Sequence, residues 1–356
     1  MYPAIAIADE VRTMNPEAAI MFAGTRERME WGAVPMAGYE IAPIAAAGFQ
    51  RALSVRNLIM PFKMVRGLAQ SVSLIRAFDP DVAVGTGGYV TGPVLMAAVL
   101  GGRPTLVQEQ NAYPGVTNRI LARFASEIHV AFPEATEFFP RDRCVVTGNP
   151  TRSELEHADR GEARRFFDLP EDSRVLLVFG GSLGSQALNE VLLQHWSRIA
   201  SEGVYVIWQT GSRYYERVRD TLGEAPWIRL REYIDRMELA YAAADLALCR
   251  AGAITCSELQ VSGTPAVLVP SPNVAEDHQT KNARSLEGAG AAVVIHESDL
   301  ESGLVARLHD ILFDQERLDR MARSARASAH PQAATAIAES VLRLASGGTH
   351  SEAGRR

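Results

Sequence analysis

The sequence predicts an α/β protein with two doubly wound parallel sheets, and three observations support this class. The chain has 356 residues, enough for two domains that each have their own core. Short apolar runs typical of buried strands alternate with segments of helical spacing through both halves. Three of these runs end in a glycine-containing turn that opens a helix. Ligands of such sheets bind at the carboxyl ends of the strands, where these turns fall.

The best-defined unit lies between residues 174 and 199. Val175–Phe179 is an apolar strand, Gly180–Ser185 is a glycine-rich turn, and Gln186–Ile199 shows helical spacing. The free N–H groups and the positive dipole end of a helix favour a phosphate there, and small residues let it approach the backbone. The turn is not GxGxxG and lacks the lysine of a P-loop. A diphosphate site and a tight turn without a ligand both fit this loop.

Two further turns repeat this pattern, at Gly85–Tyr89 and at Arg250–Ala253. The other strands are expected at 19–23, 104–108, 127–131, 143–147, 204–209, 227–231 and 266–269. The other helices are expected at 5–11, 94–100, 119–124, 161–167, 214–222, 237–243, 254–261, 300–327 and 331–345. Gly148-Asn149-Pro150 is expected to form a turn and a hinge. We therefore expect domains at 1–150 and 151–330, a closing helix at 331–345 and a flexible tail at 346–356.

Composition narrows the class of protein. The net charge of −6 argues against a general nucleic-acid binder. The three cysteines have no metal-ligand or CxxC spacing and suit a reducing compartment. We expect no metal site and no cofactor. No apolar run is long enough to span a membrane, and no signal peptide is visible, so the cytoplasm is the default location.

A basic and apolar segment extends from Ile41 to Phe78 and contains no Asp or Glu. Mixed basic and large apolar side chains can bind an anionic membrane surface. A core-facing amphipathic helix with a solvated basic face explains the same pattern. The candidate membrane contacts are Leu58, Ile59, Phe62, Lys63 and Arg66.

Seven short motifs, in order and over almost the whole chain, resemble the MurG family of bacterial glycosyltransferases. They are GTGGY at 85–89, EQN at 109–111 with Gly115 and Asn118, GNP at 148–150 with Arg152, GGSLG at 180–184, YIDRM at 233–237, RAG at 250–252 with Ser257-Glu258, and DHQTKNA at 277–283. The resemblance implies the GT-B fold, with two Rossmann-like domains facing across a cleft. It also implies inverting transfer of GlcNAc from UDP-GlcNAc to the C4 hydroxyl of the muramoyl sugar of lipid I, which gives lipid II in peptidoglycan synthesis.

The resemblance also assigns roles to individual residues. Ser182 and neighbouring N–H groups would hold the diphosphate, and Arg152 would add charge-assisted bonds. Ile234 would bind uracil through its backbone. Glu258, expected in the first turn of its helix, would accept both ribose hydroxyls. Ala253, Ile254, Thr255, Cys256 and Ser257 would line the nucleotide, Gln279 and Asn111 would bond the sugar, and Gly87, Gly88 and Tyr89 would face the acceptor.

The family touches the membrane in the region of the basic and apolar segment, because its acceptor is a polyprenyl lipid. We therefore expect a peripheral protein on the cytoplasmic face of the cell membrane. The expected partners are UDP-GlcNAc, lipid I, the anionic membrane surface, and cell-wall and division proteins, with no nucleic acid.

The sequence departs from the family at its start. The family begins with a strand and a glycine loop that ends in Gly-Gly-His. The next residue of the family aligns with Met1, and Tyr2-Pro3-Ala4 follow it here. That histidine is a candidate general base, so the catalytic residue is unknown here. The sequence therefore suggests that the true start lies upstream of Met1. We expect the central strand position of the first sheet to be empty, which leaves unpaired strand edges. We also expect the 356 residues to transfer little or no GlcNAc to lipid I.

Two other functions remain open from the sequence. One is a UDP-GlcNAc 2-epimerase on the same fold, which would need carboxylates and a histidine at the sugar. The other is a non-catalytic UDP-sugar binder.

Overall fold

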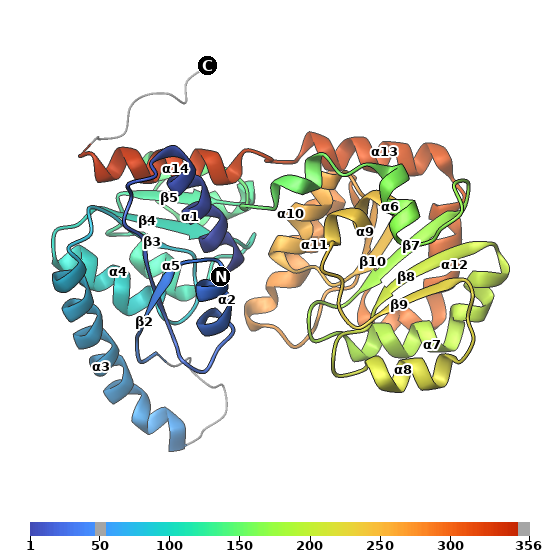
Figure 1. The fold of residues 1–356 in the computed structure, drawn as a ribbon, viewed down its shortest axis with the longest axis horizontal. Helices are drawn as coiled ribbons and strands as arrows, with labels where there is room; N and C mark the ends of the chain where they lie inside the picture. The colour runs from blue at the N-terminus through green and yellow to red at the C-terminus, as the bar shows by residue number, and fades with distance from the viewer. Residues whose placement is uncertain (47–54, 348–356) are drawn as a thin grey trace. The chain divides into compact units, whose positions relative to one another are not determined.

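The computed structural model describes residues 1–46 and 55–347, apart from the side chains of 55–63 and 275. The chain divides into two compact units. Unit 1 comprises Met1–Pro150 and Gln332–Arg356, and unit 2 comprises Thr151–Pro331. Figure 1 shows the elements of each unit along the chain.

Unit 1 contains six strands and six α-helices within its described residues. The strands are β1 (Met21–Gly24), β2 (Glu40–Pro43), β3 (Ala83–Gly85), β4 (Thr105–Glu109), β5 (Glu127–Val130) and β6 (Cys144–Val146). The helices are α1 (Tyr2–Met14), α2 (Glu30–Met36), α3 (Val55–Phe78), α4 (Thr91–Leu100), α5 (Val116–Leu121) and α14 (Ala333–Ala345), with 3-10 turns η1 (Pro133–Phe138) and η2 (Arg141–Arg143).

The strands of unit 1 form two parallel sheets rather than one. β1 pairs with β2, and the second sheet has the order β3-β4-β5-β6. Among the described residues, no strand lies between β1 and β3. A cavity of about 680 Å³ separates the two sheets, and Ile20, Phe22, Val82 and Val84 are among its lining residues. The strand edges of β1 and β3 that face this cavity therefore present apolar side chains.

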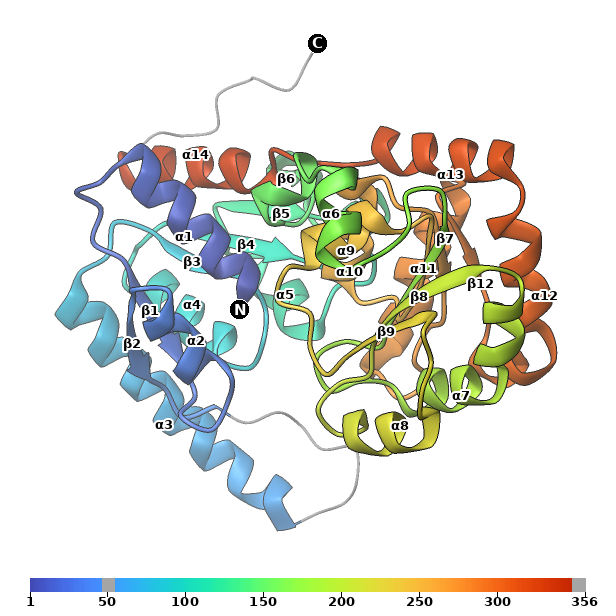
Figure 2. The same cartoon turned by 45° about the vertical axis from the view of Figure 1, so that its right-hand side comes forward.

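Helix α14 joins unit 1 although it follows unit 2 in the chain. Ile337, Val341 and Leu344 of α14 pack in one buried cluster with Ile7 and Val11 of α1. Figures 1 and 2 show the two helices side by side. An ion pair between Arg343 and the buried carboxylate of Glu127 fixes the helix to the start of β5. Packing and charge together hold the end of the chain on the first unit.

Unit 2 contains six strands and eight α-helices within its described residues. The strands are β7 (Arg174–Phe179), β8 (Val204–Gln209), β9 (Ile228–Arg231), β10 (Leu246–Cys249), β11 (Ala266–Leu268) and β12 (Ala292–Val294). The helices are α6 (Arg160–Phe166), α7 (Gln186–Ser201), α8 (Tyr215–Leu222), α9 (Met237–Ala243), α10 (Ala253–Ser262), α11 (His278–Gly288), α12 (Leu300–Leu312) and α13 (Gln315–Ala327), with 3-10 turns η3 (Ser153–Glu156), η4 (Ala275–Asp277) and η5 (Glu297–Asp299).

All six strands of unit 2 are parallel and form one sheet in the order β12-β11-β10-β7-β8-β9. The chain runs outward from β7 through β8 and β9, then returns to β10 and runs outward on the other side. The topological switch point therefore lies between β7 and β10, where ligands of such sheets bind. Helix α7 packs Leu188, Val191 and Leu192 into the core below β7 and β8. The predicted class, two α/β units with parallel sheets, is confirmed.

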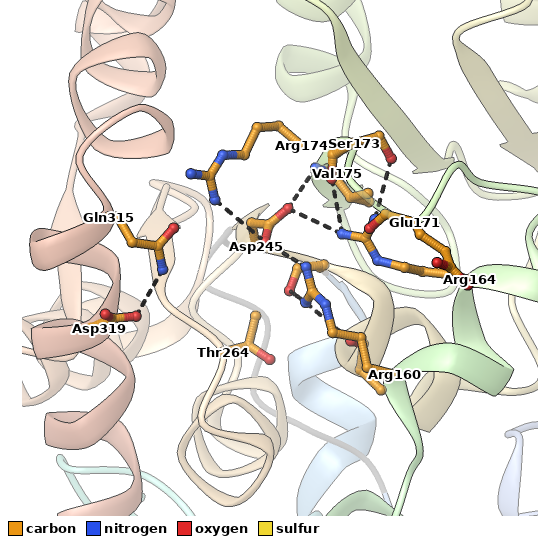
Figure 3. A network of polar contacts seen from close by, with 12 residues as sticks. Arg160, Arg164, Glu171, Ser173, Arg174, Val175, Asp245, Thr264, Gln315 and Asp319 are labelled. Atoms are coloured by element: carbon orange, nitrogen blue, oxygen red, sulfur yellow. Dashed lines mark hydrogen bonds and ion pairs between the residues drawn. The ribbon is translucent and has the colours of Figure 1, made fainter.

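Asp245 lies at the amino ends of the unit 2 strands, at the opposite end of the strands from the switch point, and bonds several neighbouring segments there (Figure 3). Its carboxylate accepts from the backbone N–H of Val175 at 2.8 Å and pairs with Arg160 at 2.6 Å. Arg164 and Arg174 lie at 3.7 and 3.8 Å from the same carboxylate. The buried guanidinium of Arg164 also donates to the carbonyls of residues 170, 171 and 173. This network ties α6, the first α-helix of unit 2, to the central strands.

Several elements differ from the sequence prediction. The expected helix at 300–327 is two helices, because Asp314 caps α13 by accepting from the N–H of Arg317. Helix α11 begins at His278 in a polar part of the sequence and was not expected, and neither were β2, β12 and α2. The expected strand at 19–23 is β1, which begins two residues later.

Two loops of unit 2 touch through their backbones at the carboxyl edge of the sheet. Gly184, in the loop after β7, has φ +77°, and a Cβ there would lie 1.9 Å from the carbonyl oxygen of Thr210. Gly181, in the same loop, has φ +89°, and a Cβ there would meet no atom within 4 Å. The approach of the two loops thus depends on Gly184, while Gly181 serves the backbone conformation alone.

We predict that Gly184→Ala destabilises unit 2 far more than Gly181→Ala. Left-handed strain costs about 1–2 kcal/mol in both variants, and the collision with Thr210 adds about 1–3 kcal/mol of overpacking in Gly184→Ala. Denaturant unfolding monitored by tryptophan fluorescence measures the difference. Equal destabilisation by the two variants would contradict the backbone contact.

Candidate functional site

The loops that follow β7, β8, β10 and β11 all lie at the carboxyl edge of the unit 2 sheet, because these neighbouring strands are parallel. The loop after β7 is Gly180–Ser185, and the loop after β10 is Arg250–Gly252. These two loops flank the topological switch point. The fold therefore brings the glycine loop and the start of α10 together, as the sequence predicts.

The glycine loop presents donors to solvent. Ser182 and its neighbours Gly181 and Leu183 are exposed. Within the described chain, the N–H groups of Ser182 and Leu183 have no intramolecular acceptor, whereas Gly184 donates to the carbonyl of Gly181 at 3.0 Å. Ser185 caps α7 by accepting from the N–H of Leu188 at 3.4 Å. The loop and the helix start thus offer an anion both free N–H groups and a helix dipole.

Arg250 holds three of these loops together. Its Nε donates to the Ser185 hydroxyl at 3.0 Å, and Nη1 donates to the carbonyls of Val269 and Pro270 at 3.2 Å each. Nη2 forms an ion pair with Glu297. Because the guanidinium spans the ends of β7, β10 and β11, it fixes the edge at which a ligand would bind.

Gln209, at the end of β8, was not identified from the sequence. Its Nε2 donates to the carbonyl of Gly181 at 3.1 Å, and its Oε1 accepts from the N–H of Ile234 at 2.8 Å. The N–H of Ile234 is therefore committed within the protein. A uracil contact through the backbone of Ile234 would have to use the carbonyl oxygen.

Glu258 lies in the second turn of α10, so the expectation of a first-turn carboxylate is wrong: α10 begins at Ala253 and has no acidic residue in its first turn. The helix dipole consequently gives Glu258 little stabilisation. Its Oε2 accepts from the hydroxyl of Tyr241 at 3.1 Å. Burial raises the pKa of the Glu258 carboxyl, while Arg152 and the Tyr241 hydroxyl act in the opposite direction.

Arg152 precedes η3 and is exposed. Its Nη1 donates to the carbonyl of Asp235 at 3.2 Å, and its charge acts on Glu258. Within the described chain, Arg152 forms no hydrogen bond or ion pair with the glycine loop. Arg152 therefore lies on the Glu258 side of the edge, and its expected bond to the diphosphate stays a prediction.

The start of α10 divides into accessible and buried positions. Ala253, Ile254 and Thr255 are partly exposed, whereas Ser257 and Cys256 are buried. Burial raises the pKa of the Cys256 thiol to about 12. The Cys256 side chain faces the core, so only the backbone of this residue could line a ligand, and the expected lining by residues 253–257 stays a prediction.

Gln279 is positioned in the first turn of α11. Its Oε1 accepts from the backbone N–H of Ser271 at 2.8 Å and so stabilises the loop after β11. Its side-chain amide lies at the carboxyl ends of the strands, as do the other candidate residues of unit 2.

The acceptor-side candidates lie in unit 1, at the carboxyl end of β3. Gly87 and Gly88 have φ of +88° and +84°, and Tyr89 is exposed with the Arg28 guanidinium 4.9 Å from its ring centroid. Gln110 donates to the carbonyl of Thr86 at 2.6 Å and joins this loop to the loop after β4.

Asn111 also lies in unit 1, unlike the other residues expected to bind UDP-GlcNAc. The buried carboxylate of Glu109 accepts from the N–H and the side-chain amide of Asn111, at 3.0 and 3.3 Å, and from the amide of Asn118 at 2.7 Å. The N–H of Gly115 donates to it at 3.2 Å. Glu109 therefore shapes the loop that carries Asn111.

The candidate membrane residues fall on α3. Leu58, Ile59, Phe62 and Lys63 have side chains outside the described residues, while Arg66 is exposed. The neighbouring helices also expose apolar side chains, which the sequence did not predict. They are Leu100 at the end of α4 and Val116 and Ile120 on α5. Helix α3 packs against α4, and α4 packs against α5.

Neither a metal cluster nor a membrane span is present in the described part of the chain. No group of three or more His, Cys, Asp or Glu side chains there could hold a metal ion. The helices described also lack the length and hydropathy needed to cross a bilayer.

Comparison with known proteins agrees with this arrangement. The glycosyltransferase family 28 N-terminal domain matches residues 1–130, and the family 28 C-terminal domain matches residues 175–337. The UDP-N-acetylglucosamine–N-acetylmuramyl-(pentapeptide) pyrophosphoryl-undecaprenol N-acetylglucosamine transferase of Salinibacter ruber is 59% identical over 346 residues, which cover 97% of this chain and 94% of that protein.

Among solved structures, MurG of Acinetobacter baumannii is similar, with a TM-score of 0.78, 30% identity, and coverage of 96% of this chain and 95% of that one. The UDP-GlcNAc 2-epimerase of Neisseria meningitidis, solved with UDP-GlcNAc, shares the fold alone, with a TM-score of 0.65, 13% identity and 96% coverage of each chain. The predicted family is thereby confirmed: the chain belongs to the MurG family of glycosyltransferases.

Proposed function

We propose that this protein transfers GlcNAc from UDP-GlcNAc to the C4 hydroxyl of the muramoyl sugar of lipid I, with inversion at the anomeric carbon. The observation that carries the proposal is the joint placement of the glycine loop and Glu258 at the switch point of unit 2. The loop offers free donors to a diphosphate, and the carboxylate offers an acceptor to a ribose. The relative of Salinibacter ruber, named for this transfer, supports the choice of reaction.

In this proposal the chain's own groups stabilise the leaving UDP. The N–H groups of Ser182 and Leu183 and the start of α7 hold the diphosphate as its charge increases during bond breaking. Arg152, exposed and beside Glu258, adds a charge-assisted bond after a change of rotamer. The carbonyl of Ile234 accepts from N3–H of uracil, since its N–H is bonded to Gln209.

The sugar and the acceptor use further groups. Gln279 bonds the hydroxyls or the acetamido group of GlcNAc, and Asn111 is proposed for the same task. Gly87, Gly88 and Tyr89 of unit 1 receive the acceptor pyrophosphate, because the backbone N–H groups of Gly87 and Gly88 have no acceptor within the described chain and can bond an anion. Lipid I is the acceptor in this proposal.

Product analysis tests the reaction. Purified protein is incubated with radiolabelled UDP-GlcNAc, first alone and then with lipid I in detergent. We expect label in the lipid fraction only when lipid I is present, and no epimer of the donor in either reaction. The test depends on which product forms, labelled lipid or an epimer of the donor, and not on how fast it forms. Epimer formation without acceptor would favour a 2-epimerase, and binding of UDP-GlcNAc with neither product would favour a sugar-nucleotide binder.

Donor binding is predicted to depend on the Glu258 carboxylate. Glu258→Ala should weaken UDP-GlcNAc affinity by about 1.5–3 kcal/mol, the range for hydrogen bonds to charged groups. Isothermal titration calorimetry measures this change. Glu190→Ala, which removes a surface carboxylate of α7, is the matched control and should leave affinity unchanged. Unaltered affinity in folded Glu258→Ala protein would remove the ribose assignment.

We also propose that unit 1 docks on the cytoplasmic face of the cell membrane, where a polyprenyl acceptor resides. Exposed Met64 and Val65 directly precede Arg66 on α3, and exposed Val116 and Ile120 lie one helical turn apart on α5. Apolar side chains exposed beside cations can enter the headgroup boundary of an anionic bilayer. Partners among cell-wall and division proteins belong to the same proposal.

Charge reversal tests the membrane contact. Lys63→Glu with Arg66→Glu should reduce co-sedimentation with anionic phospholipid vesicles, with the largest loss at low salt because screening weakens the attraction. The control is Arg198→Glu with Arg323→Glu, which makes the same change in net charge at exposed positions of unit 2. Equal binding by both double variants would show that total charge, not this helix, governs the interaction.

A further inference from the structure

Tyr241 is a buried hydroxyl-bearing residue that the proposed chemistry does not otherwise use. It lies on α9 with 1% of its surface exposed, and its ring packs edge-to-face on Phe179 at a centroid distance of 5.9 Å. Its hydroxyl donates to Oε2 of Glu258 on α10 at 3.1 Å. The ring is thus fixed by the core, and its hydroxyl points at the carboxylate proposed to bind the ribose.

This bond leaves Oε1 of Glu258 for a ligand, and a carboxylate oxygen can accept hydrogen bonds from two hydroxyls. Within the described chain, Oε1 of Glu258 makes no hydrogen bond, whereas Oε2 is occupied by Tyr241. A glutamate side chain has several rotatable bonds, and fixing it on binding costs conformational entropy. Because Tyr241 already holds one oxygen, part of that ordering is complete before a ligand arrives.

The charges around this pair keep the roles of donor and acceptor distinct. Burial raises the pKa of Tyr241 well above its ordinary value, so the phenol stays protonated and donates. Burial also raises the pKa of Glu258, and the bond from Tyr241 together with Arg152 opposes that effect. Tyr241 therefore favours the ionised carboxylate, which is the form that accepts hydrogen bonds from sugar hydroxyls.

We propose that Tyr241 is a positioning residue that holds the Glu258 carboxylate for the two hydroxyls of a ribose, and so makes the site selective for ribonucleoside diphosphates. The inference rests on the proposed function, because it assumes that Glu258 binds the nucleotide. Tyr241 acts only through Glu258 and touches no ligand itself.

The test compares UDP with 2′,3′-dideoxy-UDP, which lacks both hydroxyls, by calorimetry on the full chain. Wild-type protein should prefer UDP. Tyr241→Phe should lower UDP affinity by about 3–10-fold, a modest share of what a charge-assisted bond contributes, and leave affinity for the dideoxy compound within about twofold. A change confined to UDP separates positioning from a general loss of structure, which would weaken both ligands.

Three further variants complete the design. Tyr39→Phe removes the hydrogen bond from another buried tyrosine to a carboxylate, in unit 1, from the Tyr39 hydroxyl to Asp9 at 2.6 Å, and should leave the preference intact. Glu258→Gln should abolish the preference, and adding Tyr241→Phe to it should change nothing more, because the two residues act as one unit.

The outcomes separate the inference from the proposal beneath it. If Glu258→Gln abolishes the preference but Tyr241→Phe retains it, the positioning role is overturned and the ribose assignment survives. If wild-type protein binds both nucleotides equally, both are overturned. Equal weakening of both nucleotides by Tyr241→Phe also overturns the inference, because the hydroxyl would then serve the fold alone.

Discussion

The arrangement of unit 2 depends on one buried amide, the side chain of Gln209. It joins the glycine loop after β7 to the segment that contains Ile234, through bonds of 3.1 Å to Gly181 and 2.8 Å from Ile234. The bridge is possible because β7 and β8 pair in parallel with Phe179 opposite Gln209. An amide has one acceptor and one donor end, so a single side chain can satisfy a carbonyl and an N–H at once. The distance between the proposed diphosphate and uracil positions is therefore set before any ligand binds.

Much of the fold could be predicted from the sequence, because the long strands of unit 2 are buried on both faces and consist of continuous apolar runs. Short or polar elements could not. β12 has three residues and β2 begins with a glutamate and ends with a proline, so neither shows a strand pattern. Helix α11 follows two non-glycine residues at positive φ and buries few of its side chains. Its polar sequence therefore resembles a loop.

The sequence predicted those parts of the site whose residues are consecutive in the chain. It did not predict the hydrogen bonds between residues that are far apart in the chain. The glycine loop is visible because strand, turn and helix are consecutive. The bond from Tyr241 to Glu258 spans 17 residues, and that from Gln209 to Gly181 spans 28. No local pattern reports such pairs. The orientation of Cys256 depends on how α10 is rotated against the sheet, and the sequence does not specify that rotation.

The central claim is that the donor nucleotide binds at the carboxyl edge of unit 2, and a crystal structure of the protein with UDP-GlcNAc tests it most directly. The account predicts diphosphate oxygens within hydrogen-bond distance of the N–H groups of Ser182 and Leu183. It also predicts ribose hydroxyls on Oε1 of Glu258 and N3–H of uracil on the carbonyl of Ile234. A nucleotide bound elsewhere on the chain, or bound at this edge without a contact to Glu258, would contradict the account.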